Sequence, residues 1–207
     1  CTPEIAGADR KSKRSRMYAS IATTYRGIRF RSRLEAKWAT VFDLLGWSWE
    51  YEPLDLNGWI PDFLIRAKYK PILVEVKPIV ELDQKVTKKI EGVFGYTDPG
   101  IGEEITSISN DYDILILALA PFVCKYEGSS CIGWITDDFF GSWQTAVVIE
   151  PTENKSVYGL ASGTSGYYAD RITGVGDGDH YYSQLYADDL REMWARATNA
   201  TQWKAPR

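Results

Sequence analysis

The chain has 207 residues, a net charge of -4, and hydrophobic and aromatic fractions of 44% and 14%, which are typical of a folded globular protein and exclude a disordered chain. No run of about 18 apolar residues is present, so we expect no contact with a membrane interior. Cys1, Cys124 and Cys131 are too few for a disulfide framework and lack paired ligands for zinc, so we expect a reduced protein of the cytoplasm.

The N-terminal part of the chain is strongly basic. Residues 1–40 carry ten Lys or Arg and three acidic residues, which leaves the rest of the chain acidic. Residues 1–16 are polar and without periodicity, which predicts a basic, flexible N-terminal arm. Such an arm can bind a polyanion, although a solvated tail explains the same residues. The first residue is Cys and not Met, so we expect the natural start of the chain to be missing.

Two elements are predicted between residues 25 and 46. In "YRGIRFRSR" basic residues alternate in part with apolar ones, which predicts a short strand or extended arm with one basic face. Plain surface arginines are the alternative. The segment "SRLEAKWATVFDLLG", residues 32–46, places Leu34, Trp38 and Leu45 at helical spacing and ends at a glycine, which predicts an amphipathic helix. The arginines before or at its start are Arg26, Arg29, Arg31 and Arg33.

Three strand-like segments follow the helix, at residues 47–53, 58–66 and 71–77, and turn signals between them predict a meander. Residues 79–94 have the pattern of a second helix. Residues 112–121, "YDILILALAP", form a continuous apolar run that is typical of a buried central strand. The predicted order to residue 120 is therefore helix, three strands, helix, strand.

The pattern is weaker after residue 120. Residues 131–136 and 144–151 are predicted strands, residues 159–181 have the composition of a loop, and residues 183–198 are predicted to form a closing helix. We therefore expect an α/β (α+β) protein with a central mixed β-sheet flanked by helices. Its predicted parts are a basic arm at 1–16, a core at 17–120 and a C-terminal extension at 121–207 that packs on the core.

Three polar side chains interrupt the second and third predicted strands. Asp62 follows Pro61, while Glu75 and Lys77 share one face of the third strand because side chains alternate with a period of two. If the two strands form a hairpin, all three side chains converge at one edge of the sheet. Two carboxylates held close together repel each other unless a cation lies between them, and oxygen ligands suit Mg²⁺ or Mn²⁺. The pattern favours a divalent metal site for phosphodiester hydrolysis.

Simpler explanations exist for each of these residues. Asp62 is compatible with a Pro-Asp turn, and Glu75 with Lys77 is compatible with a solvated cross-strand pair. Glu35 follows Ser32 at the spacing of a capping box, Ser-x-x-Glu, which by itself explains a glutamate in the first turn of the helix.

The segment "PDFLIRAKYKPILVEVK" resembles the PD-(D/E)XK nuclease superfamily, and the predicted element order αβββαβ resembles the restriction-endonuclease-like core of that superfamily. The wider stretch that begins "YRGIRFRSRLEAKW" is similar to nuclease-like proteins of tailed bacteriophages. The resemblance covers about residues 25–120. It implies that Asp62 and Glu75 bind a metal, that Lys77 assists the attacking water, and that Glu35 supports a second metal or the water network.

The resemblance therefore predicts a metal-dependent deoxyribonuclease with Mg²⁺ or Mn²⁺ as its cofactor and DNA as its partner. The four arginines at 26, 29, 31 and 33 lie just before Glu35 and would contact DNA at the active site. One alternative is a structure-specific resolvase or transposon-type end nuclease that acts as a homodimer. Another is a non-catalytic nucleic-acid-binding or phage assembly protein on a nuclease scaffold.

Overall fold

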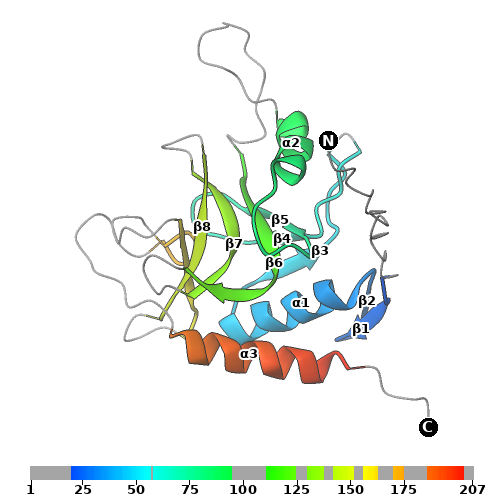
Figure 1. Cartoon of the computed structure of the whole chain (residues 1–207), viewed down its shortest axis with the longest axis vertical. Coiled ribbons are helices and arrows are strands. Elements are labelled where there is room, and N and C mark those ends of the chain that lie inside the picture. The colour runs from blue at the N-terminus through cyan, green and yellow to red at the C-terminus, as the bar shows by residue number, and fades with distance from the viewer. Residues whose placement is uncertain are drawn as a thin grey trace, which may run out of the picture.

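The computed structural model describes residues 20–56, 58–94, 111–124, 130–137, 142–151, 156–162, 170–174 and 186–202. Their centre is a seven-stranded sheet in the order β3-β4-β5-β6-β7-β8-β9 (Figure 1). Neighbouring strands β5 and β6 are parallel, and all other neighbouring pairs in this sheet are antiparallel. The strands are β3 (Trp49–Tyr51), β4 (Phe63–Ile65), β5 (Ile72–Val76), β6 (Asp113–Val123), β7 (Ser130–Asp137), β8 (Ser142–Ile149) and β9 (Gly159–Ser162).

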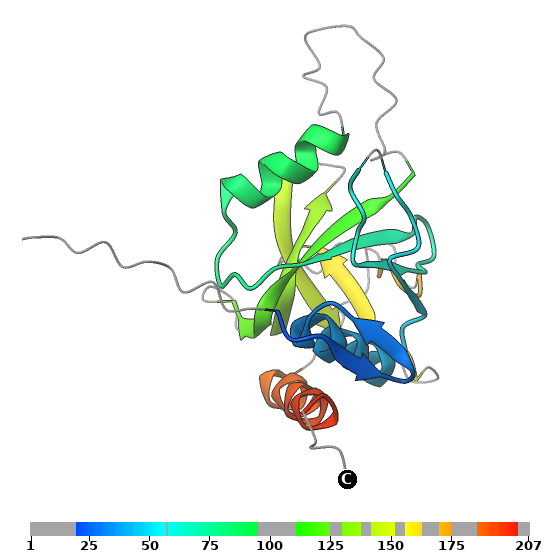
Figure 2. The ribbon, with the colours of Figure 1, turned by 90° about the vertical axis from the view of Figure 1, so that its right-hand side faces the viewer.

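Helices cover both faces of the sheet. Helix α1 (Arg33–Leu45) lies on one face and α2 (Gln84–Phe94) on the other, while α3 (Ala187–Ala200) packs against the outer side of α1 (Figure 2). The indole rings of Trp38 and Trp194 lie 4.8 Å apart between α1 and α3. Both faces of the central strands are therefore withdrawn from water, and polar residues at the strand ends are the ones placed to meet a ligand.

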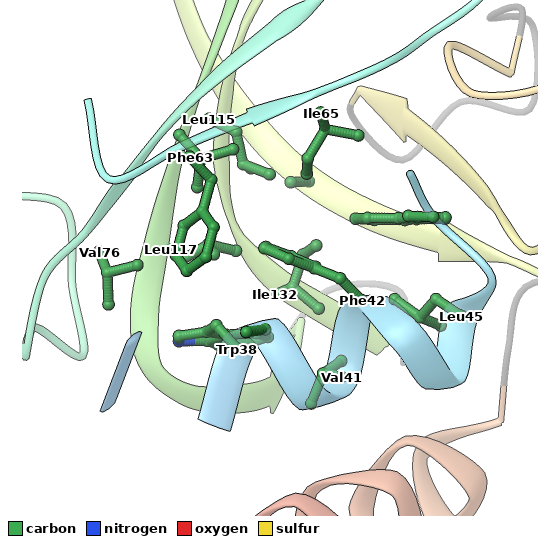
Figure 3. Packing of buried hydrophobic residues seen from close by; sticks show 14 of the residues in the cluster. Trp38, Val41, Phe42, Leu45, Phe63, Ile65, Val76, Leu115, Leu117 and Ile132 are labelled. Atoms are coloured by element: carbon green, nitrogen blue, oxygen red, sulfur yellow. The ribbon is translucent and has the colours of Figure 1, made fainter. Parts of the chain in front are cut away.

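Alternation along the strands divides the core into two clusters. On β5, Val74 packs toward α1 and Leu73 toward α2, and on β6 Leu115 and Ile116 are divided in the same way. Figure 3 shows the larger cluster, between α1 and the sheet. Because Glu75 follows this alternation, its side chain lies on the α2 face together with Leu73.

Helix α1 has well-formed ends that explain its bounds. Ser32 is the N-cap, and its hydroxyl accepts a hydrogen bond from the Glu35 N–H at 3.1 Å. Gly46 ends the helix with a φ of 75°, a left-handed conformation that glycine adopts without strain. Trp38 and Phe42 lie one turn apart, both fully buried against the sheet. These ends fix the position of the first turn of the helix, which contains Glu35.

A small hairpin precedes α1 and delivers a basic residue to the sheet edge. Strands β1 (Thr23–Tyr25) and β2 (Ile28–Phe30) pair antiparallel around a turn in which Arg26 and Gly27 both have positive φ. Phe30 is fully buried, with its ring centroid 4.6 Å from that of Tyr51. This aromatic anchor holds the next residue, Arg31, beside the ends of β3 and β4.

Most predicted elements are present. The order helix, three strands, helix, strand is confirmed, as are the meander and the central mixed sheet flanked by helices. The basic segment at 25–33 is a hairpin strand followed by the helix start, and α2 begins at Gln84 and not at residue 79. The prediction of a loop throughout 159–181 is wrong in part, because residues 159–162 pair with β8 as β9.

The C-terminal residues continue the same sheet. The predicted boundary at residue 120 falls inside β6, and β7, β8 and β9 add three strands beyond it. The predicted basic arm at 1–16 lies outside the described residues. Among the helices of the described ranges, none is long and apolar enough to cross a membrane.

Candidate active site

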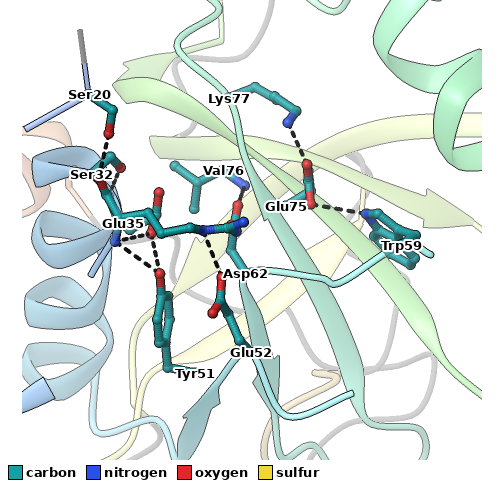
Figure 4. Close-up of polar contacts among 11 residues, drawn as sticks. Ser20, Ser32, Glu35, Tyr51, Glu52, Trp59, Asp62, Glu75, Val76 and Lys77 are labelled. Atoms are coloured by element: carbon teal, nitrogen blue, oxygen red, sulfur yellow. Dashed lines mark hydrogen bonds and ion pairs between the residues drawn. The ribbon is translucent and has the colours of Figure 1, made fainter. Parts of the chain in front are cut away.

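Two neighbouring strands and the preceding helix bring the predicted acidic residues together. Asp62 directly precedes β4, and Glu75 lies in β5 beside it. Phe63 pairs with Val74, so extending this register by one residue places Asp62 opposite Glu75. Glu35 comes from the first turn of α1. In Figure 4, Asp62 lies between Glu35 on one side and Glu75 on the other.

Asp62 is a buried carboxylate whose negative charge is only partly compensated. The residue is 4% exposed, and its Oδ2 accepts a hydrogen bond from the Val76 N–H at 2.7 Å. Burial raises the pKa of Asp62 to about 7, and the nearby charges of Glu75 and Glu35 add to the rise. The Val76 N–H and the Arg31 guanidinium lower the pKa but do not cancel these effects. A further cation at this place would stabilise the ionised form.

Glu75 is held by one charged and one neutral donor. Its Oε1 forms an ion pair with the Lys77 ammonium, and its Oε2 accepts a hydrogen bond from the Trp59 indole N–H at 3.1 Å. Trp59 is itself buried, in the smaller core cluster on the α2 side of the sheet. Glu75 therefore has a fixed orientation, and Lys77 contacts Glu75.

Glu35 does more than close a capping box. The Ser32 hydroxyl accepts from the Glu35 N–H, but the Glu35 carboxylate does not return to the N-cap as a full box requires. Its Oε2 instead accepts from the Tyr51 hydroxyl at 2.6 Å and from the Arg31 N–H at 3.2 Å. Burial and the hydrogen bond to Glu35 raise the pKa of Tyr51, so its hydroxyl stays protonated and keeps donating.

The structure separates the four predicted DNA-contacting arginines. Arg31 lies in the site, where its Nη2 is 2.6 Å from Asp62 Oδ1. Arg26 is paired with Asp43 at 2.9 Å, near the far end of α1. Arg29 is exposed on β2, and the Nε of Arg33 is buried without a hydrogen-bond partner in the described part of the chain. Arg31 alone of the four therefore contacts a predicted acidic site residue in these ranges.

Three residues of the site carry no signal in the sequence. They are Tyr51, Glu52 and Trp59, which hold Glu35, Arg31 and Glu75 respectively. Tyr51 and Glu52 lie at the end of β3, and their proximity to Asp62 depends on the pairing of β3 with β4. Glu52 also has a φ of 45°, an uncommon conformation for a residue other than glycine. Only the strand register, which the sequence does not give, could have indicated them.

The acidic cluster has the donor chemistry of a divalent metal site. Carboxylate oxygens are the ligands that Mg²⁺ and Mn²⁺ prefer. The pKa of Asp62 is raised mainly by burial and next by the charge of Glu75, so a bound cation would favour its ionised form. Within the described ranges, however, no three acidic, histidine or cysteine side chains are grouped closely enough to hold an ion as they stand. Arg31 and Lys77 already occupy one oxygen each of Asp62 and Glu75. A metal bound at Asp62 Oδ1 would compete with Arg31 for that oxygen.

Comparison with known protein families, with curated proteins and with solved structures finds no match to this chain. Any function has therefore to be inferred from this chain's own residues.

The hydrogen bond from Trp59 to Glu75 is expected to stabilise the fold. Replacing Trp59 with Phe removes the N–H that donates to the Glu75 carboxylate and keeps an aromatic ring. We therefore expect the free energy of unfolding to fall by about 1–2 kcal/mol. Chemical denaturation of Trp59→Phe, Glu75→Gln and the double variant measures the coupling. Trp47→Phe is the matched control, because its indole donates to the Tyr158 carbonyl at 2.8 Å. The same cycle is measured for Trp47→Phe with Glu75→Gln. A coupling energy between Trp59 and Glu75 no larger than the one between Trp47 and Glu75 would contradict the prediction.

Proposed function

We propose that this protein is a metal-dependent nuclease with a restriction-endonuclease-like core, which hydrolyses phosphodiester bonds of DNA. The observation that carries the proposal is the meeting of Glu35, Asp62 and Glu75 at one sheet edge, with Lys77 paired to Glu75. A buried carboxylate cluster of this kind costs free energy in the absence of a bound cation. The resemblance of "PDF" and "VEVK" to nuclease motifs suggests why the cluster is there, since a nuclease would use it to bind a catalytic metal.

In this proposal Asp62 and Glu75 would hold the metal, with support from Glu35. A bound Mg²⁺ or Mn²⁺ would acidify a water molecule and offset charge on the phosphoryl oxygens. Trp59 keeps the Glu75 carboxylate oriented, and Tyr51 does the same for Glu35. The Lys77 ammonium supplies a positive charge where negative charge develops during attack on the phosphate.

The pairing of the acids with protein cations favours one other candidate function. Arg31 and Lys77 partly neutralise Asp62 and Glu75 without a metal. A protein that keeps the nuclease scaffold only to bind nucleic acid would need no more than this. The two functions differ in turnover, because a binding protein retains DNA affinity but does not cut in the presence of Mg²⁺.

A cleavage assay on several DNA forms tests the proposal. We expect the protein to cut DNA in Mg²⁺ or Mn²⁺ and not in EDTA, and Glu75→Gln to lose activity by about a hundredfold or more. Glu50→Gln is the matched control, since Glu50 is an exposed acid on β3 that pairs with Arg66. Supercoiled circles, single-stranded circles, linear duplexes and branched junctions distinguish endonuclease, exonuclease and resolvase activity.

Each result of this assay decides between the candidates. Cutting that is independent of metal, or equal in Glu75→Gln and the unmodified protein, would refute the nuclease site proposed here. Metal-independent DNA binding with no cutting of any substrate would support the non-catalytic function. Sedimentation of the protein alone and with a junction measures whether it acts as a homodimer.

A further inference from the structure

Arg31 is the cation that covers Asp62 in this structure. Its Nη2 lies 2.6 Å from Asp62 Oδ1, and its Nε lies 2.7 Å from Glu52 Oε1. The side chain is 56% exposed, whereas Asp62 is buried. The guanidinium is therefore the more exposed partner of this ion pair. Figure 4 shows Asp62 and Glu52, the two carboxylates that it contacts.

The backbone of Arg31 is fixed although its side chain is exposed. The Arg31 N–H donates to both Glu35 and the Tyr51 hydroxyl, and the Ser20 hydroxyl donates to the Arg31 carbonyl. The preceding Phe30 is fully buried. A long, exposed side chain on a fixed backbone can change its partner by rotation of its own bonds, without a movement of the backbone.

The present partner of Arg31 conflicts with metal binding at Asp62. Asp62 Oδ2 accepts from the Val76 N–H, and Oδ1 is in contact with the guanidinium. A divalent ion bound by Asp62 would compete for Oδ1 and would repel the positive charge of Arg31 at short range. Arg31 and the metal are therefore alternatives at the same carboxylate oxygen.

We propose, on the basis of the proposed function, that Arg31 is an exchangeable counter-ion of Asp62 that a divalent metal displaces and that then binds a DNA phosphate. The Arg31 guanidinium has five N–H donors and the planar shape that matches a phosphate group. Glu52 contacts the Nε edge and keeps the arginine near the site after it leaves Asp62. Metal binding and DNA binding then strengthen each other, because metal binding frees the Arg31 guanidinium to contact a DNA phosphate.

A metal titration without DNA tests the displacement directly. Free Mn²⁺ is measured by electron paramagnetic resonance at pH 8 for the unmodified protein and for Arg31→Gln, Arg29→Gln and Asp62→Asn. Arg31→Gln is expected to bind Mn²⁺ about three- to tenfold more tightly, because it no longer competes for Asp62. Arg29 is the matched control, as an exposed arginine two residues earlier in the hairpin, and its loss should change the affinity by less than about twofold.

The outcomes separate this inference from the proposed function. Equal or weaker Mn²⁺ binding by Arg31→Gln, with binding by the unmodified protein that is lost in Asp62→Asn, would refute the exchange and leave the metal site in place. An equal gain from Arg29→Gln would also refute it, since general charge would then explain the effect. Absence of saturable Mn²⁺ binding in all proteins would overturn both proposals.

The second half of the exchange has its own measurement. Binding of a labelled DNA duplex is followed with and without Ca²⁺, an ion that occupies oxygen sites and allows DNA affinity to be measured apart from turnover. We expect Ca²⁺ to strengthen DNA binding by the unmodified protein more than by Arg31→Gln. An equal gain in both proteins would show that Arg31 does not pass to the phosphate.

Discussion

Replacing Lys77 with methionine is expected to lower the rate of DNA cleavage by about a hundred- to a thousandfold, in line with the loss of one preorganised positive group from an active site. Lys77 follows β5 directly and pairs with Glu75, so in the proposed nuclease its ammonium would offset the charge that develops on the attacked phosphate. Methionine keeps an unbranched side chain, one atom shorter than that of lysine, and has no charge. Single-turnover cleavage at saturating Mg²⁺ measures the effect on the chemical step.

The fold should tolerate this change, which allows the effect to be assigned to chemistry. The Lys77 side chain is partly exposed, and its backbone N–H is bonded to the Leu117 carbonyl whatever the side chain is. Lys85→Met is the matched control, because Lys85 is an exposed lysine on α2. It should alter cleavage by at most a few-fold. Activity of Lys77→Met within about threefold of the unmodified protein would remove Lys77 from the mechanism.

The parts of the fold that follow from periodicity were predictable. The spacing of Leu34, Trp38 and Leu45 defines α1, and the apolar run at 112–121 identifies β6 as a buried central strand. Residues 159–162 were not predictable as a strand, because β9 is an edge strand of four residues in a Gly- and Ser-rich stretch. Its pairing with β8 is a tertiary contact that no local pattern carries.

The candidate site was predictable to the extent that it depends on alternation within strands. Asp62 lies beside Glu75 because β4 and β5 pair as the hairpin that the sequence indicated, and Lys77 pairs with Glu75. Tyr51 and Glu52 reach the site through the pairing of β3 with β4, and their residue types indicate nothing by themselves. The partners of the arginines, Asp43 for Arg26 and Asp62 for Arg31, likewise depend on how the β1–β2 hairpin packs on α1.

Replacing Asp62 with asparagine is expected to stabilise the metal-free protein at alkaline pH. The Asp62 pKa is about 7 in the folded protein against an ordinary value of 3.8, with burial as the main cause and the charge of Glu75 as the next. Between these two values the folded protein binds more protons than the unfolded chain. Its free energy of unfolding therefore falls as the pH rises through this window, and the penalty is constant above it.

Asparagine has no such ionisation, so the variant gains on the unmodified protein as the pH rises. We expect its advantage in unfolding free energy to grow by about 2–3 kcal/mol between pH 5 and pH 8, measured by denaturant titration in EDTA. Because Glu75 lies close to Asp62, the midpoint of the change belongs to the carboxylate pair and not to one residue. A difference that does not vary with pH would mean that Asp62 ionises as an exposed aspartate does.

Mg²⁺ should reverse the order of stability if the cluster is a metal site. A ligand that binds only the folded state stabilises it by an amount that grows with the logarithm of its concentration. At pH 8 the unmodified protein should therefore gain stability with added Mg²⁺, while Asp62→Asn, which lacks the carboxylate that binds the ion, should not. If Mg²⁺ leaves both proteins unchanged, the cluster is not a metal site, and the ion pair of Asp62 with Arg31 serves to hold the β1–β2 hairpin on the sheet edge.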